Sequence, residues 1–170
     1  DPKAKFLNKL NYLRKNPSLV FGAFKRFRNS REVSSLEKMF LLVDPNADEV
    51  IVRSRIRNIE HHRSHLASAF FASPFDESAI VSLDGSGDFT TTMIATGKEN
   101  KMEIIDSVDF PVSIGLLYTS FTQYLGFPHY GDEYKVMGLA PYGNAKYTQE
   151  VRKLIRFLPN GLFNWDASYF

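Results

Sequence analysis

Two histidines, His61 and His65, are four positions apart, a spacing that places both imidazoles on one face of a helix. Two imidazoles one turn apart can bind a single metal ion. A third ligand must come from elsewhere, and Asp84, at the end of the next expected strand, is the acceptor-rich candidate. Imidazole with carboxylate suits iron(II), zinc or manganese. His62 lies about 100° round the helix and is not expected to be a ligand. The alternative is that these histidines are hydrogen-bonded helix residues, and the spacing leaves both interpretations open.

A glycine-rich segment, Asp84-Gly85-Ser86-Gly87-Asp88, follows that strand. Its backbone N–H groups can approach a phosphate closely, because glycine presents no side chain. The flanking carboxylates can hold a divalent cation that bridges phosphates. The segment is not a P-loop, since it lacks the Lys-Ser/Thr ending and no helix follows directly. The alternative is a plain hairpin turn, for which Asp-Gly is a strong signal.

A third segment, residues 131–143, combines acids, a lysine, glycines and a proline. Asp132 or Glu133 could orient a hydroxyl or accept its proton, and Lys135 could offset negative charge on a ligand. The alternative is a surface loop between two helices. No Ser-His-Asp arrangement or dinucleotide fingerprint accompanies it, and His129 is interpreted as structural.

The elements that must position these residues follow from hydrophobic periodicity and from capping signals. We expect a mixed α/β chain in which three strands and a helix form a β-β-β-α unit with flanking helices. The expected elements, in chain order, are an apolar helical stripe at Phe6, Leu10 and Leu13, a helix capped at Asn16–Pro17 with a stripe from Val20 to Phe27, a helix after the Ser34–Glu37 capping box, a strand over 49–59, a helix over 60–72, strands over 79–83, 90–96 and 102–108, a helix over 114–125, a helix over 146–157, and a turn at 159–161 before a last strand.

Composition narrows the function classes. The chain has 170 residues, 44% of them hydrophobic, which suits about one globular domain rather than a disordered chain. There is no cysteine, so disulfides, thiolate metal sites and cysteine nucleophiles are excluded. We expect no membrane span, and a cytoplasmic location fits the absence of cysteine. Because the chain starts at Asp1 and stops at Phe170, we expect a piece of a longer protein.

Charge is distributed unevenly along the chain. Residues 1–57 carry a balance of +7, and residues 58–170 carry −5. A basic first third could bind an anionic partner, including RNA or a membrane surface. The alternative is a solvated helix face, which is the commoner meaning of such a pattern.

Four blocks of the chain, in this order, resemble the NodU/CmcH carbamoyltransferases. They are residues 60–75 with His61 and His65, residues 84–87, residues 113–118, and residues 131–143, which contain KVMGLAPYG. A single HxxxH or DGxG would carry little weight, but the four blocks in sequence are specific. They span roughly residues 58–143, while residues 1–57 fit only by position.

The resemblance implies a fold and a reaction. It implies an actin-like ATPase (ASKHA) domain, similar to the TsaD-type tRNA-threonylcarbamoyl transferases, of which this chain would be an internal fragment. A YrdC-like domain, absent here, would make carbamoyl adenylate from carbamoyl phosphate and ATP. The actin-like domain would pass the carbamoyl group to a hydroxyl of a natural product or saccharide.

The resemblance also implies residue roles. His61 and His65 match the iron ligands of the family, and Asp84 matches an aspartate close to both metal and nucleotide. Gly85, Ser86 and Gly87 match the turn beside the phosphates. The choice of general base among Asp84, Asp132 and Glu133 stays open.

Because a further aspartate ligand and the second domain would lie outside this chain, we expect the isolated chain to be inactive. The competing interpretations are a tRNA-modifying enzyme of the TsaD type and a basic binding module without catalysis. Nucleic acid is the less expected partner, and self-association through exposed core faces remains an alternative.

Overall fold

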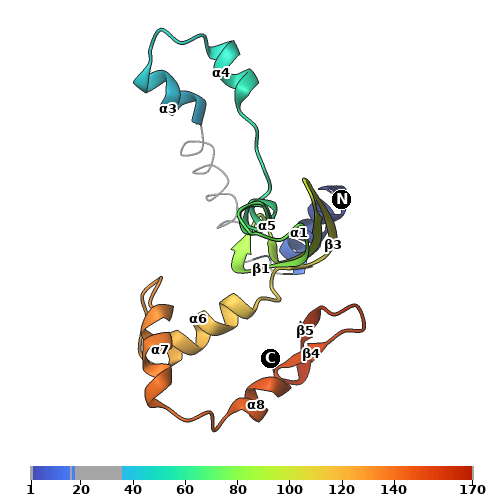
Figure 1. Cartoon of the computed structure of the whole chain (residues 1–170). Helices are drawn as coiled ribbons and strands as arrows, with labels where there is room; N and C mark the ends of the chain where they lie inside the picture. Colours follow the sequence, from blue (N-terminus) through green and yellow to red (C-terminus); the bar gives the residue numbers. More distant parts are fainter. Residues whose placement is uncertain (1, 16, 18–35, 170) are drawn as a thin grey trace. The chain divides into compact units, whose positions relative to one another are not determined.

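The computed structural model of the chain describes residues 2–15, 17 and 36–169, and Figure 1 colours its elements along the sequence. The elements are α1 (Pro2–Lys15), α3 (Leu36–Val43), α4 (Glu49–Arg55), α5 (His61–Phe71), β1 (Glu77–Gly87), β2 (Thr90–Lys98), β3 (Lys101–Asp109), α6 (Ile114–Tyr124), α7 (Glu133–Leu139), the 3₁₀ turn η1 (Ala140–Tyr142), α8 (Thr148–Lys153), β4 (Ile155–Phe157), β5 (Phe163–Trp165) and the 3₁₀ turn η2 (Ala167–Tyr169). The chain divides into two compact units, Asp1–Ile59 and Glu60–Phe170. The mixed α/β class is therefore confirmed.

The first unit is helical in its described part, and it contains one wrong prediction. The strand expected over residues 49–59 is instead the helix α4. Asp48 caps this helix, because its carboxylate accepts hydrogen bonds from the backbone N–H groups of Val50 and Ile51 at 2.8 and 3.1 Å. β-Branched residues favour strands only where a partner strand lies alongside, and none of the described residues supplies one here.

The other helical expectations in this unit have mixed outcomes. The helix expected around Leu10 is confirmed as α1. The helix expected after the Ser34–Glu37 capping box is confirmed as α3, although Ser34 itself lies outside the described residues. The Asn16 cap and the stripe from Val20 to Phe27 also lie outside the described residues.

The second unit is built on an antiparallel sheet with strand order β1-β2-β3, so the three predicted strands are confirmed. The turn between β1 and β2 lies at Asp88 and Phe89, whose φ angles are +50° and +80°. It is therefore later than the expected turn over residues 84–88, because β1 continues to Gly87.

The helix predicted over residues 60–72 is confirmed as α5, and it packs on one face of this sheet (Figure 1). Its buried residues are four apart along the helix: His62, Leu66 and Phe70. Leu66 and Phe70 form a core with Ile80, Met93 and Ala95 of the first two strands. Side chains alternate along a strand, so Asp84 shares the α5-facing side of β1 with Ile80 and Ser82.

A second core lies beyond β3. Val108 packs there with Leu162 and Phe163 from the hairpin β4–β5. Ile114 of α6 also packs against this cluster, which ties the predicted helix over 114–125 to the sheet. The predicted turn at 159–161 and the strand after it are confirmed by this hairpin.

Two other segments differ from expectation. Residues 131–143 are not simply a loop, because they contain α7 and a 3₁₀ turn. The helix expected over 146–157 is confined to α8, and Ile155–Phe157 forms β4 because it pairs with Phe163–Trp165. Of the helices in the described part of the chain, none combines the length and apolar character needed to cross a membrane.

Candidate metal centre

An irregularity in β1 begins at Asp84. Leu83 pairs with Thr92, and the next pair is Gly87 with Thr90. Three residues of β1, 84–86, therefore lie opposite a single residue of β2. Such a bulge bends a strand and redirects its side chains, and bulges are common beside functional sites. Here it begins at Asp84, whose carboxylate lies on the α5 side of the strand and reaches His61 in the first turn of α5.

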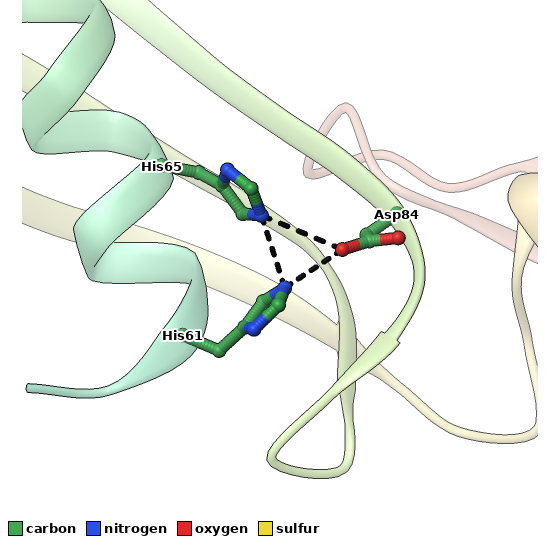
Figure 2. Close-up of side chains that lie close together, drawn as sticks. All are labelled: His61, His65 and Asp84. Carbon is green, nitrogen blue, oxygen red and sulfur yellow. Dashed lines mark hydrogen bonds and ion pairs between the residues drawn. The ribbon is translucent and has the colours of Figure 1, made fainter.

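His61, His65 and Asp84 converge on one point, as Figure 2 shows. The Nε2 atom of His61 lies 2.7 Å from Asp84 Oδ2 and 3.0 Å from His65 Nε2. The third edge of the triangle, from His65 Nε2 to Asp84 Oδ2, is 3.5 Å. The sequence prediction that these three residues come together is therefore met by the geometry.

The triangle has the dimensions of a metal site. A metal ion about 2.1 Å from each ligand would separate neighbouring ligand atoms by about 3.0 Å at right angles and about 3.4 Å at tetrahedral angles. The three observed edges fall around these values. Two imidazoles and one carboxylate on one side of an ion leave other coordination positions open, which suits a catalytic rather than a closed structural site. The three side chains are 38% to 53% exposed, so further ligands can reach the point between them.

The charge state of Asp84 suits a metal ligand. Its pKa is lowered, chiefly by the hydrogen bond with His61. Partial burial acts in the opposite direction, while the Gly85 N–H, 2.6 Å from Oδ1, and the nearby imidazoles lower the pKa further. Asp84 is thus ionised at neutral pH, with one oxygen held by the backbone and the other facing the histidines.

His62 is a structural partner of this cluster that the sequence reasoning did not identify. It is fully buried, as its place on the core-facing side of α5 requires. Its Nε2 lies 2.9 Å from the carbonyl oxygen of Thr90, which can only accept, so Nε2 carries a proton. Its Nδ1 lies 2.8 Å from the Ser82 hydroxyl. His62 therefore fastens α5 to both β1 and β2, next to the residue that faces Asp84.

The N-terminus of α6 supports the bulge from the other side. Ser113 is fully buried, and its hydroxyl lies 3.0 and 2.7 Å from the carbonyl oxygens of Asp84 and Gly85. The same oxygen accepts the N–H of Leu116, which makes Ser113 the N-cap of α6. A Cβ at Gly115 would lie 2.6 Å from the Gly85 nitrogen, so only glycine lets the helix approach this closely. A serine directly ahead of an apolar helical stripe is a sequence signal that could have predicted this cap.

The three residues predicted to face phosphate have different surroundings. Gly85 donates its N–H to Asp84, and its carbonyl faces Ser113. Ser86 is exposed. Gly87 is buried, and the ring of His61 occupies the space that a Cβ would need. Their role in nucleotide binding stays a prediction.

Asp132, Glu133 and Lys135 form a separate group at α7. Lys135 Nζ lies 2.6 Å from Asp132 Oδ1, and Asp132 also accepts the N–H of His129. The Thr119 hydroxyl of α6 donates to Glu133 Oε1 at 2.6 Å. Within the described residues, no hydrogen bond or ion pair joins this group to the His61–His65–Asp84 cluster. The catalytic and ligand-binding roles predicted for these three residues stay predictions.

The pair of Asp132 and Lys135 predicts a pH dependence of stability. The pKa of the buried Asp132 is lowered from 3.8, chiefly by the hydrogen bond from Lys135. A lowered pKa in the folded chain contributes stability that is present above 3.8 and is lost as the pH falls through the folded value. We expect Asp132→Asn to lower the free energy of unfolding at pH 7, with the deficit shrinking below pH 3.8. Urea unfolding across this range measures it.

Lys135→Met is the matched variant for this experiment, since it removes the main cause of the lowered pKa and keeps the carboxylate. It should show the same loss of pH dependence as Asp132→Asn. A deficit for Asp132→Asn that stays constant from neutral to strongly acidic pH would contradict the assignment.

Comparison with known proteins identifies the family to which the chain belongs. The profile of the family described as Carbamoyltransferase N-terminus matches residues 7–170. The chain therefore belongs to the carbamoyltransferase N-terminus family.

Individual relatives agree with this assignment. An uncharacterized protein of Synechocystis is 46% identical over 112 residues, which is 65% of this chain and 18% of the relative. Nodulation protein NolNO of Sinorhizobium fredii is 41% identical over 64% of this chain and 16% of its own length. Nodulation protein NolO of Bradyrhizobium diazoefficiens is 40% identical over 61% of this chain and 19% of its own length. The chain thus spans less than a fifth of the length of these relatives.

Proposed function

We propose that the protein containing this chain is an O-carbamoyltransferase that moves a carbamoyl group from carbamoyl adenylate to a hydroxyl of a natural product or saccharide. The observation that supports this most strongly is the convergence of His61, His65 and Asp84 in a chain of the carbamoyltransferase N-terminus family. A carbamoyl donor carries a carbonyl and a phosphate, and both are groups that a site of this kind can bind.

We assign the resident metal to the His61–His65–Asp84 cluster, with Fe(II) as the first candidate. Two neutral imidazoles and one carboxylate are a donor set typical of Fe(II), although other divalent ions accept it. When bound, the ion supplies a Lewis acid that polarises the carbonyl or phosphate oxygen of the donor. The chain itself presents the three ligand atoms in position and keeps Asp84 ionised.

The transfer step needs an acceptor for the hydroxyl proton. The acceptor oxygen bonds to the carbamoyl carbon, the bond from that carbon to the phosphate oxygen breaks, and AMP leaves. The lowered pKa of Asp84 suits ligation better than proton transfer at neutral pH. Of the other two acids, Asp132 is buried and paired with Lys135, whereas Glu133 is half-buried. The pKa of Glu133 is lowered as well, chiefly by the hydrogen bond from Thr119, so pKa does not single out one of the three acids as the proton acceptor.

An actin-like ATPase fold is part of the proposal. The order β1-β2-β3-α6 matches the β-β-β-α unit expected for it. The N-terminus of α6 lies against the backbone of residues 84–85, where its partial positive charge favours a phosphate. ATP and carbamoyl phosphate would then be converted to carbamoyl adenylate by a YrdC-like domain outside this chain. The chain alone is therefore expected not to catalyse carbamoyl transfer.

The test is label transfer by the full-length protein. Radiolabelled carbamoyl phosphate, ATP and Fe(II) are supplied with hydroxylated saccharides, hydroxylated natural products and tRNA as competing acceptors. We expect label on a hydroxylated small molecule or saccharide, and a loss on the order of 100-fold in His65→Ala. The exposed residue His129 offers a control, since His129→Ala should retain transfer. Label on tRNA alone would support the TsaD-type alternative, and equal transfer by His65→Ala would contradict the proposal.

A further inference from the structure

The end of β1 and the turn after it contact His61 at its ring and at its backbone. The ring lies directly against Gly87: a Cβ added to Gly87 would be 2.0 Å from Cδ2 of the imidazole and 2.2 Å from Cγ. Neither distance is sterically possible, so glycine is required for the ring to occupy this place. The carboxylate of Asp88 accepts the backbone N–H of His61 at 3.0 Å. Gly87 and Asp88 together therefore hold the ring and the main chain of His61 in place.

These contacts determine the separation of the candidate ligands. Asp84 lies on β1 just before Gly87 and Asp88, and His61 begins α5. The turn therefore couples the bulge that carries one ligand to the helix turn that carries another. The orienting partners of metal ligands typically control affinity by 10- to 100-fold.

Backbone geometry at the turn supports a specific role for Asp88. Its φ of +50° lies in the left-handed region, which aspartate tolerates better than most residues with a side chain. In that conformation its carboxylate reaches back to the first N–H of α5, one of the helix groups without an internal partner. A short side chain with an acceptor oxygen is what this contact demands.

We propose that Gly87 and Asp88 are positioning residues of the metal centre. Gly87 provides the surface on which the imidazole of His61 rests, and Asp88 fixes the start of α5, so that His61 Nε2 faces Asp84. This inference rests on the proposed metal site. The side of Gly87 that a Cβ would occupy is then taken by the imidazole, although Gly87 was expected to face phosphate.

The chain contains a matched control for Gly87. Gly97 on β2 supports Phe70 of α5 in the same way, because a Cβ there would lie 2.6 Å from the Phe70 ring. Gly87→Ala and Gly97→Ala should both disturb the packing of α5 on the sheet. The His61–His65–Asp84 cluster contains His61 but not Phe70, so only Gly87→Ala should displace a ligand.

The experiment is titration of the full-length protein with Co(II), followed by visible absorption, with urea unfolding of each variant without metal. We expect Gly87→Ala to weaken Co(II) binding by about 10- to 100-fold and to change the absorption spectrum. Gly97→Ala should lose stability but keep its affinity and its spectrum. Asp88→Ala should also weaken binding, and Asp88→Asn should restore it, because the amide oxygen can accept the same N–H.

The outcomes separate the two proposals. Unchanged affinity and spectrum in both Gly87→Ala and Asp88→Ala would overturn the positioning role while leaving the metal site in place. Equal losses of affinity in Gly87→Ala and Gly97→Ala would overturn it too, since general loosening of α5 would then be the cause. Failure of the unaltered full-length protein to bind Co(II) would overturn the metal assignment itself, and the positioning roles with it.

Discussion

Replacing Asp84 with asparagine is expected to weaken metal binding on the order of 100-fold or more, while the chain stays folded. The substitution keeps the size of the side chain and an oxygen that can accept the N–H of Gly85. It removes the negative charge that faces His61 and His65, and a neutral amide oxygen is a far weaker ligand than a carboxylate. Titration with Fe(II) or Co(II) measures the change directly.

Asp106 is the matched control for this substitution. It lies on β3, and its Oδ1 accepts the N–H of the following residue, Ser107, at 2.8 Å, just as Asp84 accepts that of Gly85. Its other oxygen accepts from Asn160 rather than facing a histidine. Asp106→Asn should therefore leave metal affinity unchanged. Equal affinities for Asp84→Asn and Asp106→Asn would show that Asp84 is not a ligand.

The second large effect is expected at His62, on stability. His62→Ala should lower the free energy of unfolding by about 3–5 kcal/mol. The substitution opens a cavity where a fully buried ring now lies, and it leaves the Ser82 hydroxyl and the Thr90 carbonyl without this partner. Urea unfolding of the metal-free chain measures this change in the free energy of unfolding. Without metal present, lost metal binding cannot contribute to it.

His129 provides the comparison, because its side chain is 83% exposed. His129→Ala should change the free energy of unfolding by no more than about 0.5 kcal/mol. A loss below about 1 kcal/mol in His62→Ala would mean that the buried hydrogen bonds do not fasten α5 to the sheet. His62 would then not have a structural role distinct from the ligand roles of His61 and His65.

That division of roles could be predicted in part from the sequence. Periodicity of 3.6 residues places His61 and His65 on one face of α5, and periodicity of two places Asp84 on the side of β1 that faces that helix. The helix was predicted from its small and apolar residues and the first strand from a short apolar run, and residues of both pack into the core of the second unit. Local pattern and tertiary packing agree in this part of the chain.

The remaining features depend on contacts between distant residues. The bulge at residues 84–86 and the contact of Ser113 with Asp84 exist only once β1, β2 and α6 are assembled. The β-branched segment that forms α4 was mistaken for a strand, because strand preference depends on a neighbouring strand. The sequence also could not show that the Glu133 carboxylate binds Thr119, fourteen residues away.

One metal ion bound between His61, His65 and Asp84 is the assignment on which the proposed function rests. Its most direct test is the metal content of the full-length protein, which would include the further aspartate ligand, after reconstitution with Fe(II) under anaerobic conditions, compared with the double variant His61→Ala/His65→Ala. We predict close to one ion per chain in the unaltered protein and none above background in the double variant. Metal retained by the double variant, or absent from both proteins, would contradict the account.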